Sequence, residues 1–470
     1  MIDQVALLPA YLAAGTAVAA FLADLVVPGR RGVVAGVTAA GAVATGVAAI
    51  AVGAGPHRQT FCAGPAACSY LADHRAAVIA ALFAGLTLVV VGLSVPTQRL
   101  GEYYFLLGCA MTGGVVLGYA ADLITLIVAL ETLTLPLYAL IALRTTGIDS
   151  AVTFFVVSVV STAVALLGAA LLYAVTGAVH FGQVALALQR LGGHRPPLAT
   201  AGVVLLLAGL SFKVAAVPFH AWAPTAYDGA PVPVAAYLST ASKLGGVVAI
   251  LYVSINALGP GYDIVAPTLG TLAVLSMTVG NLVALRQDRM VRLLAWSSVA
   301  QAGYLLAPLA AQRVSNETVV ASLAYTFFYV VLELTAFGAV IALRGADDGG
   351  AIADYQGAAR RRPWPAGVLA LALIGLAGLP PGLAGLFAKV VVVRALLGAS
   401  TGWLALVVAL NAVLGLAYYL RAAAPLFGPA PAARPAGRTP WPVAAALAGA
   451  ALVAVVVGFA PQLVLAAAAR

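Results

Sequence analysis

The sequence predicts an all-α, polytopic membrane protein, and three observations lead to this prediction. Hydrophobic residues make up 63% of the 470 positions, and only 8% are Asp, Glu, Lys or Arg, whereas about 25% of a soluble domain is charged. Apolar stretches of about 20 residues, the length of a bilayer-crossing helix, recur from one end of the chain to the other. No stretch has the alternating pattern of a membrane β-barrel.

About fourteen membrane-spanning helices are expected, each an apolar stretch followed by a short connection that holds Pro, Gly or Arg. Their expected limits are 5–27, 32–54, 76–95, 103–119, 121–143, 151–175, 198–219, 230–257, 265–285, 290–310, 317–343, 366–396, 401–426 and 441–465. The first stretch has no basic leader, so we expect a retained span rather than a cleaved signal peptide. The amphipathic stretch from His180 to Leu191 is expected to lie along the membrane surface.

The arginines predict the orientation of the chain. Fourteen lie in the odd-numbered connections and six in the even-numbered connections or at the C-terminus, and the positive-inside rule places the richer side in the cytoplasm. Both termini are then expected on the outer face of a bacterial plasma (inner) membrane. The net charge of +9 comes from these scattered residues, without a basic domain, so nucleic-acid binding is not expected.

The three cysteines predict no metal centre. Cys62 and Cys68 share one connection on the expected outer face, where they form either a disulfide or two free thiols. Cys109 lies mid-helix and is expected to serve packing. These spacings fit neither a zinc site nor an iron–sulfur site.

Only three of the 24 basic residues are lysines, and Lys213, Lys243 and Lys389 all lie well inside apolar stretches. A coding bias toward Arg, with the three lysines snorkelling to the interface, is the structural alternative. However, arginine stays protonated whereas a buried lysine can lose its proton. A charge at mid-bilayer costs at least about 2.5 kcal/mol. We therefore interpret the three lysines as proton-handling groups.

Carboxylates buried in the same layer are the expected partners of these lysines. Glu131 lies in the middle of the stretch 121–143, about ten residues from either end, and is the first candidate. Glu333 lies mid-helix in 317–343 and is the second candidate.

Two of the lysines lie close to expected helix breaks. Lys213 precedes Pro218, and Lys389 follows Pro380-Pro381-Gly382. Broken helices at membrane depth are tolerated only where they line an enclosed or wet cavity, and two such breaks suggest an internal repeat of the kind that marks ion pathways. His220, just past the first break, is either a proton relay or a hydrogen-bonded interfacial histidine.

Four stretches of the sequence carry a family resemblance. They are ADLITLIVALETLTLPLYAL, SFKVAAVPFHAWAPTAYDGAPVPVAAYLSTASK, RMVRLLAWSSVAQAGYLL and IADYQGAARRRPWPAGVLALALIGLAGLPPGLAGLFAK. Their order and spacing over about residues 100–425 resemble those of the antiporter-like membrane subunits of proton-pumping NADH–quinone oxidoreductase (respiratory complex I). Lys389 favours the subunit N branch over the related subunit M branch, which carries Glu at that position.

The resemblance implies a fold and a division of the chain. One membrane domain would span residues 1–470 and contain two inverted repeats of five helices, with helices 7 and 12 discontinuous. Helices 1–3 would occupy 1–100, the first repeat 101–257, the second repeat 265–426, and helix 14 would occupy 441–465.

The resemblance also implies which residues move protons. Each of the family's four proton-path positions falls in a matching motif here, and these positions are Glu131, Lys213, Lys243 and Lys389. His220 and Glu333 are auxiliary candidates.

Three positions depart from the family pattern. Thr225 stands where Asp is common, Gln301 where His is common, and Glu333 where a neutral residue is expected. Losing the histidine removes a titratable group from the central axis, so the route between Lys243 and Lys389 is expected to differ in detail.

The family resemblance implies a proton-translocating subunit of an enzyme, without a redox site of its own. The chain has no cysteine ligand set, no Gly-rich dinucleotide motif after a strand and no paired haem ligands. NAD, FMN, iron–sulfur clusters and quinone are therefore expected in partner subunits. The expected partners are neighbouring antiporter-like and small membrane subunits and the lipid bilayer. The alternatives are a subunit of a multi-subunit cation/proton antiporter or of a membrane-bound hydrogenase, and a stand-alone secondary transporter.

Overall fold

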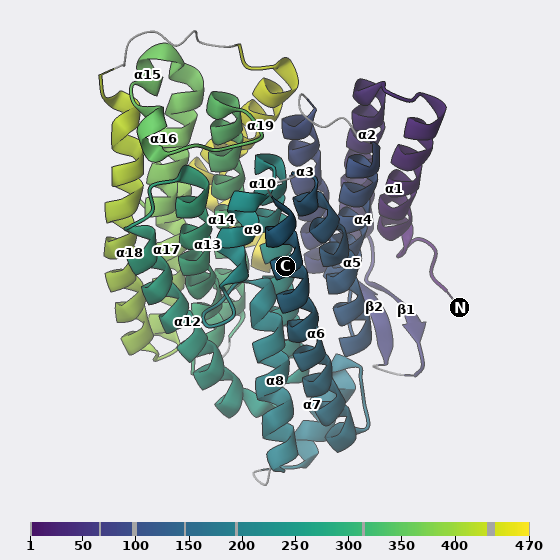
Figure 1. Cartoon of the computed structure of the whole chain (residues 1–470). Helices are drawn as coiled ribbons and strands as arrows, with labels where there is room; N and C mark the ends of the chain where they lie inside the picture. The colour runs from purple at the N-terminus through teal and green to yellow at the C-terminus, as the bar shows by residue number, and fades with distance from the viewer. Residues whose placement is uncertain are drawn as a thin grey trace.

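Long apolar helices that run side by side make up the protein, in a computed structural model that describes residues 2–64, 67–95, 101–144, 147–192, 196–312, 315–429 and 438–469 (Figure 1). The first half contains α1 (Leu8–Val26), α2 (Arg31–Gly53), α3 (His74–Ser94), α4 (Gly101–Gly118), α5 (Leu123–Ala142), α6 (Ile148–Thr176), α7 (Phe181–Arg190), α8 (Pro197–Lys213), α9 (Trp222–Gly229), α10 (Val232–Tyr237) and α11 (Lys243–Tyr252). The second half contains α12 (Tyr262–Ala284), α13 (Met290–Leu306), α14 (Asn316–Arg344), α15 (Ala358–Arg361), α16 (Pro363–Ala377), α17 (Leu383–Gly398), α18 (Gly402–Ala423), α19 (Trp441–Phe459) and α20 (Pro461–Ala469).

Short elements complete the described chain. Two π-helical turns, η2 (Leu238–Ser242) and η3 (Val253–Ala257), flank α11. The 3₁₀ turns are η4 (Gly259–Gly261), η5 (Ala307–Ala310), η6 (Ile352–Tyr355) and η7 (Ala424–Phe427). Strands β1 (Arg58–Cys62) and β2 (Cys68–Ala72) pair as an antiparallel hairpin inside a connection that the sequence analysis treated as a loop.

Eleven helical segments of the described chain are long and apolar enough to cross a membrane. The prediction of an all-α, multi-pass membrane protein is therefore confirmed, with the short hairpin as its only β-sheet among the described residues. The ends of the helices follow local chemistry. Asp73, Asp122 and Ser315 each accept a backbone N–H of the first turn of α3, α5 and α14, as N-cap residues do.

Both expected helix breaks are present. The first separates α8 from α9 over residues 214–221, and the second separates α16 from α17 over residues 378–382. Proline lies in each break, and the Val217–Pro218 and Pro380–Pro381 peptide bonds are cis. Gly378 ends α16 in the left-handed conformation with φ +85°, which glycine adopts without steric cost.

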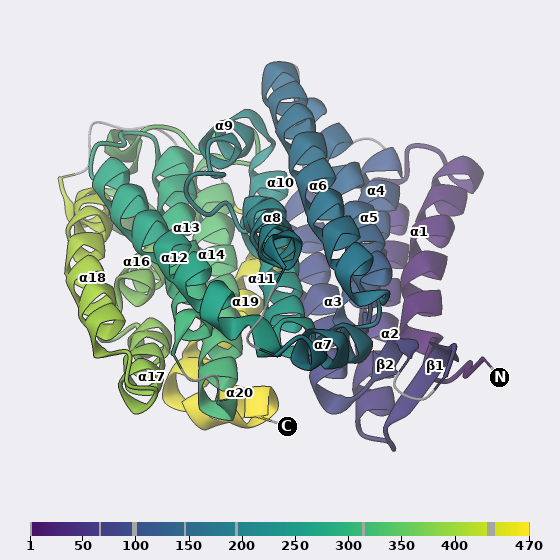
Figure 2. The ribbon, with the colours of Figure 1, turned by 90° about the horizontal axis from the view of Figure 1, so that it is seen from below.

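Three helical segments form the buried centre of the bundle. Within an apolar 18-residue window of each segment, 94% of the positions in Val232–Ala257 and Met290–Ala310 and 89% in Asn316–Arg344 are buried, against 28% in α1 and α6. Viewed from below, α11, α13 and α14 lie between the purple and blue helices of the first half and α16 to α18 (Figure 2). Polar side chains on these three segments are therefore shielded from lipid by other helices.

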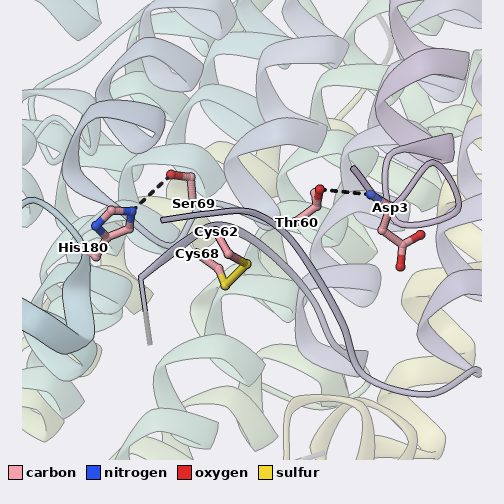
Figure 3. Close-up of a disulfide and its surroundings, with 6 residues drawn as sticks. All are labelled: Asp3, Thr60, Cys62, Cys68, Ser69 and His180. Carbon is pink, nitrogen blue, oxygen red and sulfur yellow. Dashed lines mark hydrogen bonds between the residues drawn. A yellow bond between two sulfur atoms is a disulfide. The ribbon is translucent and has the colours of Figure 1, made fainter. Parts of the chain in front are cut away.

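The β-hairpin, the N-terminal segment and α7 meet at one end of the bundle (Figure 3). A disulfide joins Cys62 to Cys68 across the hairpin. The sequence left open a disulfide or two free thiols, and the structure has the disulfide. Ser69 lies 3.4 Å from the His180 ring, and the Asp3 N–H donates to Thr60 at 3.1 Å. Helix α7 covers the expected amphipathic stretch, and Cys109 lies mid-helix as a free thiol.

Candidate functional site

Glu131 and Lys213 form a direct ion pair between α5 and α8. The Lys213 Nζ donates to the Glu131 Oε1 at 2.7 Å. The Lys213 side chain is only 5% exposed and the Glu131 side chain 22%, so the carboxylate lies at the outer edge of the pair. Lys213 is the last residue of α8, where the negative end of the helix dipole also favours a cation.

Hydroxyl groups of α5 and α6 surround this ion pair. The ammonium of Lys213 also donates to Ser158 at 3.1 Å and to Thr134 at 3.2 Å. The Thr162 hydroxyl donates to the same Glu131 oxygen at 2.7 Å. These bonds replace hydration, so a charged pair can exist at membrane depth without open water.

Lys243 lies at the start of α11, directly after the π-helical turn η2. Its Nζ donates to the Ser298 Oγ at 2.9 Å and to the Ser298 carbonyl oxygen on α13. The side chain is 1% exposed, and no Asp or Glu of the described chain forms an ion pair with it. A π-turn widens the helix locally and is frequent at functional sites.

Lys389, on α17, lies beside the second break. Its Nζ donates to the carbonyl oxygens of Leu376, at 3.3 Å, and Ala377, at the C-terminal end of α16. It also lies 5.7 Å from the centre of the Tyr304 ring. The side chain reaches a largely apolar cavity of about 550 Å³ between α16, α17 and α18. Helix-end carbonyls therefore take the place that the Glu131 carboxylate has at Lys213.

A chain of buried polar side chains runs between the surroundings of Lys243 and Lys389. Ser297, the neighbour of Ser298, bonds the Tyr419 hydroxyl. The Gln301 amide donates to Tyr419 at 3.0 Å and accepts from Tyr325 at 2.7 Å. The Tyr325 ring stacks on the Tyr304 ring at 5.8 Å between centroids, and Tyr304 faces Lys389.

Glu333, on α14, is fully buried, and neither of its carboxyl oxygens has a hydrogen-bond partner among the described residues. It interacts electrostatically with Lys243. The structure thus brings the second expected carboxylate into the surroundings of Lys243 but leaves it unbonded.

The structure does not bring the other two singled-out positions into these clusters. The His220 ring packs on Trp296 at 5.2 Å between centroids, and no hydrogen bond of the described chain joins it to a lysine. Thr225 is exposed on α9. Sequence reasoning missed the hydroxyls of Ser158 and Thr162, although their spacing of four residues on one face of an apolar helix was a usable signal.

Comparisons with known proteins place the chain in a family. It matches the family described as "NADH:quinone oxidoreductase/Mrp antiporter, TM" over residues 120–415. NADH-quinone oxidoreductase subunit N of Salinispora tropica is 59% identical over 518 aligned positions, which cover 100% of this chain and 99% of the relative. The chain belongs to the NADH-quinone oxidoreductase subunit N family.

Solved structures share the fold of this subunit N family member. A chain of respiratory complex I from Thermus thermophilus is 30% identical, with a TM-score of 0.83, and the match covers 97% of this chain and 98% of that one. A chain of the Mrp complex from Dietzia sp. has a TM-score of 0.85 at 21% identity, over 100% of this chain and 97% of that one, and shows the fold alone. The expectation of an antiporter-like, proton-translocating membrane subunit of NADH–quinone oxidoreductase is therefore confirmed.

Proposed function

We propose that Glu131, Lys213, Lys243 and Lys389 carry protons through this subunit, and that the Glu131–Lys213 pair is the switch that starts each transfer. The observation that carries the proposal is the 2.7 Å ion pair inside a shell of hydroxyl groups. A buried ammonium keeps its proton while a carboxylate contacts it. When the carboxylate moves away, burial destabilises the charged form and the proton leaves.

The next acceptor in the proposal is Lys243, which is held by Ser298 and has no ion-pair partner in the described chain. Lys389 then receives the proton beside the cavity at the second break and passes it outward. The proposed route does not include His220, because its ring packs on Trp296.

We further propose fourteen membrane spans over a single domain of residues 1–470, with the broken segments α8–α9 and α16–α17 at equivalent places in two inverted repeats, 101–257 and 265–426. The Arg-bearing α1–α2 turn and α15 lie at one end of the bundle and α7 and the hairpin at the other (Figure 1). This distribution supports both termini on the outer face of the plasma membrane. Five of the counted arginines, Arg99, Arg195, Arg313, Arg434 and Arg470, lie outside the described residues.

The proposal assigns electron transfer to other chains of the complex. NAD, FMN, iron–sulfur clusters and quinone would be held by partner subunits, while neighbouring antiporter-like and small membrane subunits contact this chain. The similarity to the Mrp complex chain concerns the fold alone, so it gives the alternative of a cation/proton antiporter subunit no further support. Co-purification of the subunits from solubilised membrane separates the two assignments.

The test compares Lys213→Arg with Lys213→Ala in inverted membrane vesicles that contain the assembled complex. Arginine keeps the charge but does not release the proton, so both variants should lower NADH-driven proton uptake by about tenfold or more. Arg394→Lys is the matched control, because Arg394 is 82% exposed. Wild-type pumping by Lys213→Arg would show that Lys213 is a structural ion-pair partner only.

A further inference from the structure

Glu333 is an acid in an environment where a carboxylate is costly. Its side chain is 0% exposed at the centre of the bundle, and both carboxyl oxygens lack hydrogen-bond partners among the described residues. Buried polar groups are normally hydrogen-bonded, and intramembrane acids are normally functional. The isolation of Glu333 therefore requires an explanation beyond packing.

Hydroxyl groups surround Lys243, although none of them bonds Glu333 among the described residues. Ser298 accepts from Lys243 at 2.9 Å and donates to the Tyr227 hydroxyl at 3.4 Å. The Tyr227 ring packs on Phe337, one turn after Glu333 on α14, at 6.5 Å between centroids. Tyr329 lies one turn before Glu333 on the same helix, and its ring centre is 5.9 Å from the Lys243 Nζ. Lys243 and Glu333 form no direct ion pair in the described chain, so a proton that passes between them needs an intermediate group such as these hydroxyls.

A small cavity lies between α13, α14, α16 and α17. It measures about 10 Å³ and is lined by Gln301, Tyr325, Tyr329, Leu376, Ala388 and neighbouring apolar atoms. This volume is close to the minimum for one water molecule. Its lining also includes Leu332, the neighbour of Glu333, and the lining residue Leu376 provides one of the carbonyl oxygens that bind Lys389, so residues next to both groups border the cavity.

Gln301 interrupts the alternative route through the polar chain. Its amide bonds Tyr419 and Tyr325, but a carboxamide has no titratable group to take up and release a proton. A carboxyl group does have one. Tyr325 and Tyr329, on the same helix as Glu333, line the small cavity together with Gln301, so the helix that carries Glu333 borders the interrupted part of the chain.

We propose that Glu333 is an additional proton carrier between Lys243 and Lys389 that bypasses Gln301. This inference rests on the proposed function. The Lys243 ammonium transfers a proton to the Glu333 carboxylate, which leaves a neutral amine and a neutral carboxylic acid. The acid then transfers the proton to the neutral amine of Lys389, which becomes an ammonium, and the Glu333 carboxylate is restored. Lys243 is reprotonated from Lys213.

The experiment compares Glu333→Gln, which keeps the shape without a titratable group, with Glu333→Asp, which keeps the carboxyl on a shorter side chain. Proton uptake and quinone reduction are measured in inverted vesicles after the assembly of the complex has been checked. We expect Glu333→Gln to lower proton uptake by about tenfold or more and Glu333→Asp to retain a substantial part of it. Glu317→Gln on the same helix is the matched control and should pump normally, because Glu317 is 51% exposed.

The outcomes separate this inference from the proposed function. Wild-type pumping by Glu333→Gln, or equal losses in the Gln and Asp variants of an assembled complex, would overturn the role of Glu333. If Lys213→Ala still abolishes pumping in that case, only the inference fails. If Lys213→Ala pumps normally as well, the proposed function fails with it.

Discussion

The two helix breaks hold their lysines in different ways. At the first break the partner of Lys213 is the carboxylate of Glu131, on the separate helix α5. At the second break the partners of Lys389 are carbonyl oxygens of Leu376 and Ala377, at the end of the other half of the same broken helix. The first arrangement is a pair of opposite charges, whereas the second is a cation at a helix C-terminus.

This difference teaches which lysine can be switched by movement. A shift of α5 relative to α8 removes the counter-charge of Lys213, because the two groups belong to different helices. Lys389 keeps its carbonyl partners as long as the break keeps its shape. Under the proposed function, we therefore expect access through the adjoining cavity of about 550 Å³, rather than a moving charge, to control the protonation of Lys389.

The largest effect is expected when the counter-charge of Lys213 is removed. Glu131→Gln removes the counter-charge that stabilises the Lys213 ammonium, and the uncompensated buried amine should lower the free energy of unfolding by about 3 kcal/mol. Adding Lys213→Met should recover most of this loss, because the uncompensated amine disappears, while pumping stays absent. Thermal unfolding of the solubilised complex measures the stability of each variant.

Lys389→Met is the contrasting variant. It leaves the carbonyl oxygens of Leu376 and Ala377 without the lysine donor, but carbonyls of a last helical turn commonly lack intrahelical partners. It should abolish pumping with little loss of stability. Equal destabilisation by Glu131→Gln and Lys389→Met would remove the distinction between the two breaks.

A smaller effect is expected when the shape of the second break is changed. An added Cβ at Gly378 would lie 2.9 Å from the Lys389 Cδ and 3.1 Å from its Nζ, at a backbone φ of +85°. The strain of about 1 kcal/mol and the displaced ammonium should lower proton uptake by about fivefold. Gly367→Ala, on the same helix with no atom within 4 Å of the added Cβ, should pump normally. Unchanged pumping by Gly378→Ala would mean that the carbonyl contacts of Lys389 do not matter.

The smallest effect concerns a surface cluster that joins α9, which follows the first break, to the second half of the chain. Arg289 bonds Asp228, at the end of α9, at 3.0 Å and Asp348, after α14, at 2.8 Å. The hydrogen bond from the Gly350 N–H, which has the larger effect, and the positive charge of Arg289 hold the pKa of Asp348 below its usual value. Because the pKa is lower in the folded state, this carboxylate stabilises the fold above the unfolded pKa of about 3.9, and the contribution is lost as the pH falls through the folded pKa.

The melting temperature of Asp348→Asn should therefore fall less steeply with decreasing pH than that of the wild type. The difference should be small, because Asp348 is 45% exposed and exposed ion pairs contribute little. Melting curves recorded over a range of acidic pH values measure it. Parallel curves for the two proteins would show that the Asp348 carboxylate contributes nothing to the pH dependence of stability.

The sequence predicted the buried lysines better than the groups that contact them. Lys213, Lys243 and Lys389 stood out as rare lysines in apolar stretches, and prolines marked both breaks. The hydroxyl shell of the first pair did not stand out, because serine and threonine are common in membrane helices and satisfy their own backbone carbonyls. The hairpin was missed because its two strands are only five residues long and lie inside a connection.

The sequence by itself determined that the chain crosses a membrane many times, where its helices break and which buried side chains are ionisable. These properties depend on composition and on local backbone chemistry, which each segment carries alone. Only the tertiary structure decided that Glu131 contacts Lys213, that Lys389 meets helix-end carbonyls and that Glu333 stays unbonded near Lys243. Each of these depends on which faces of helices distant in sequence pack together, and the uniformly apolar surfaces of membrane helices leave that choice to the packing of the whole bundle.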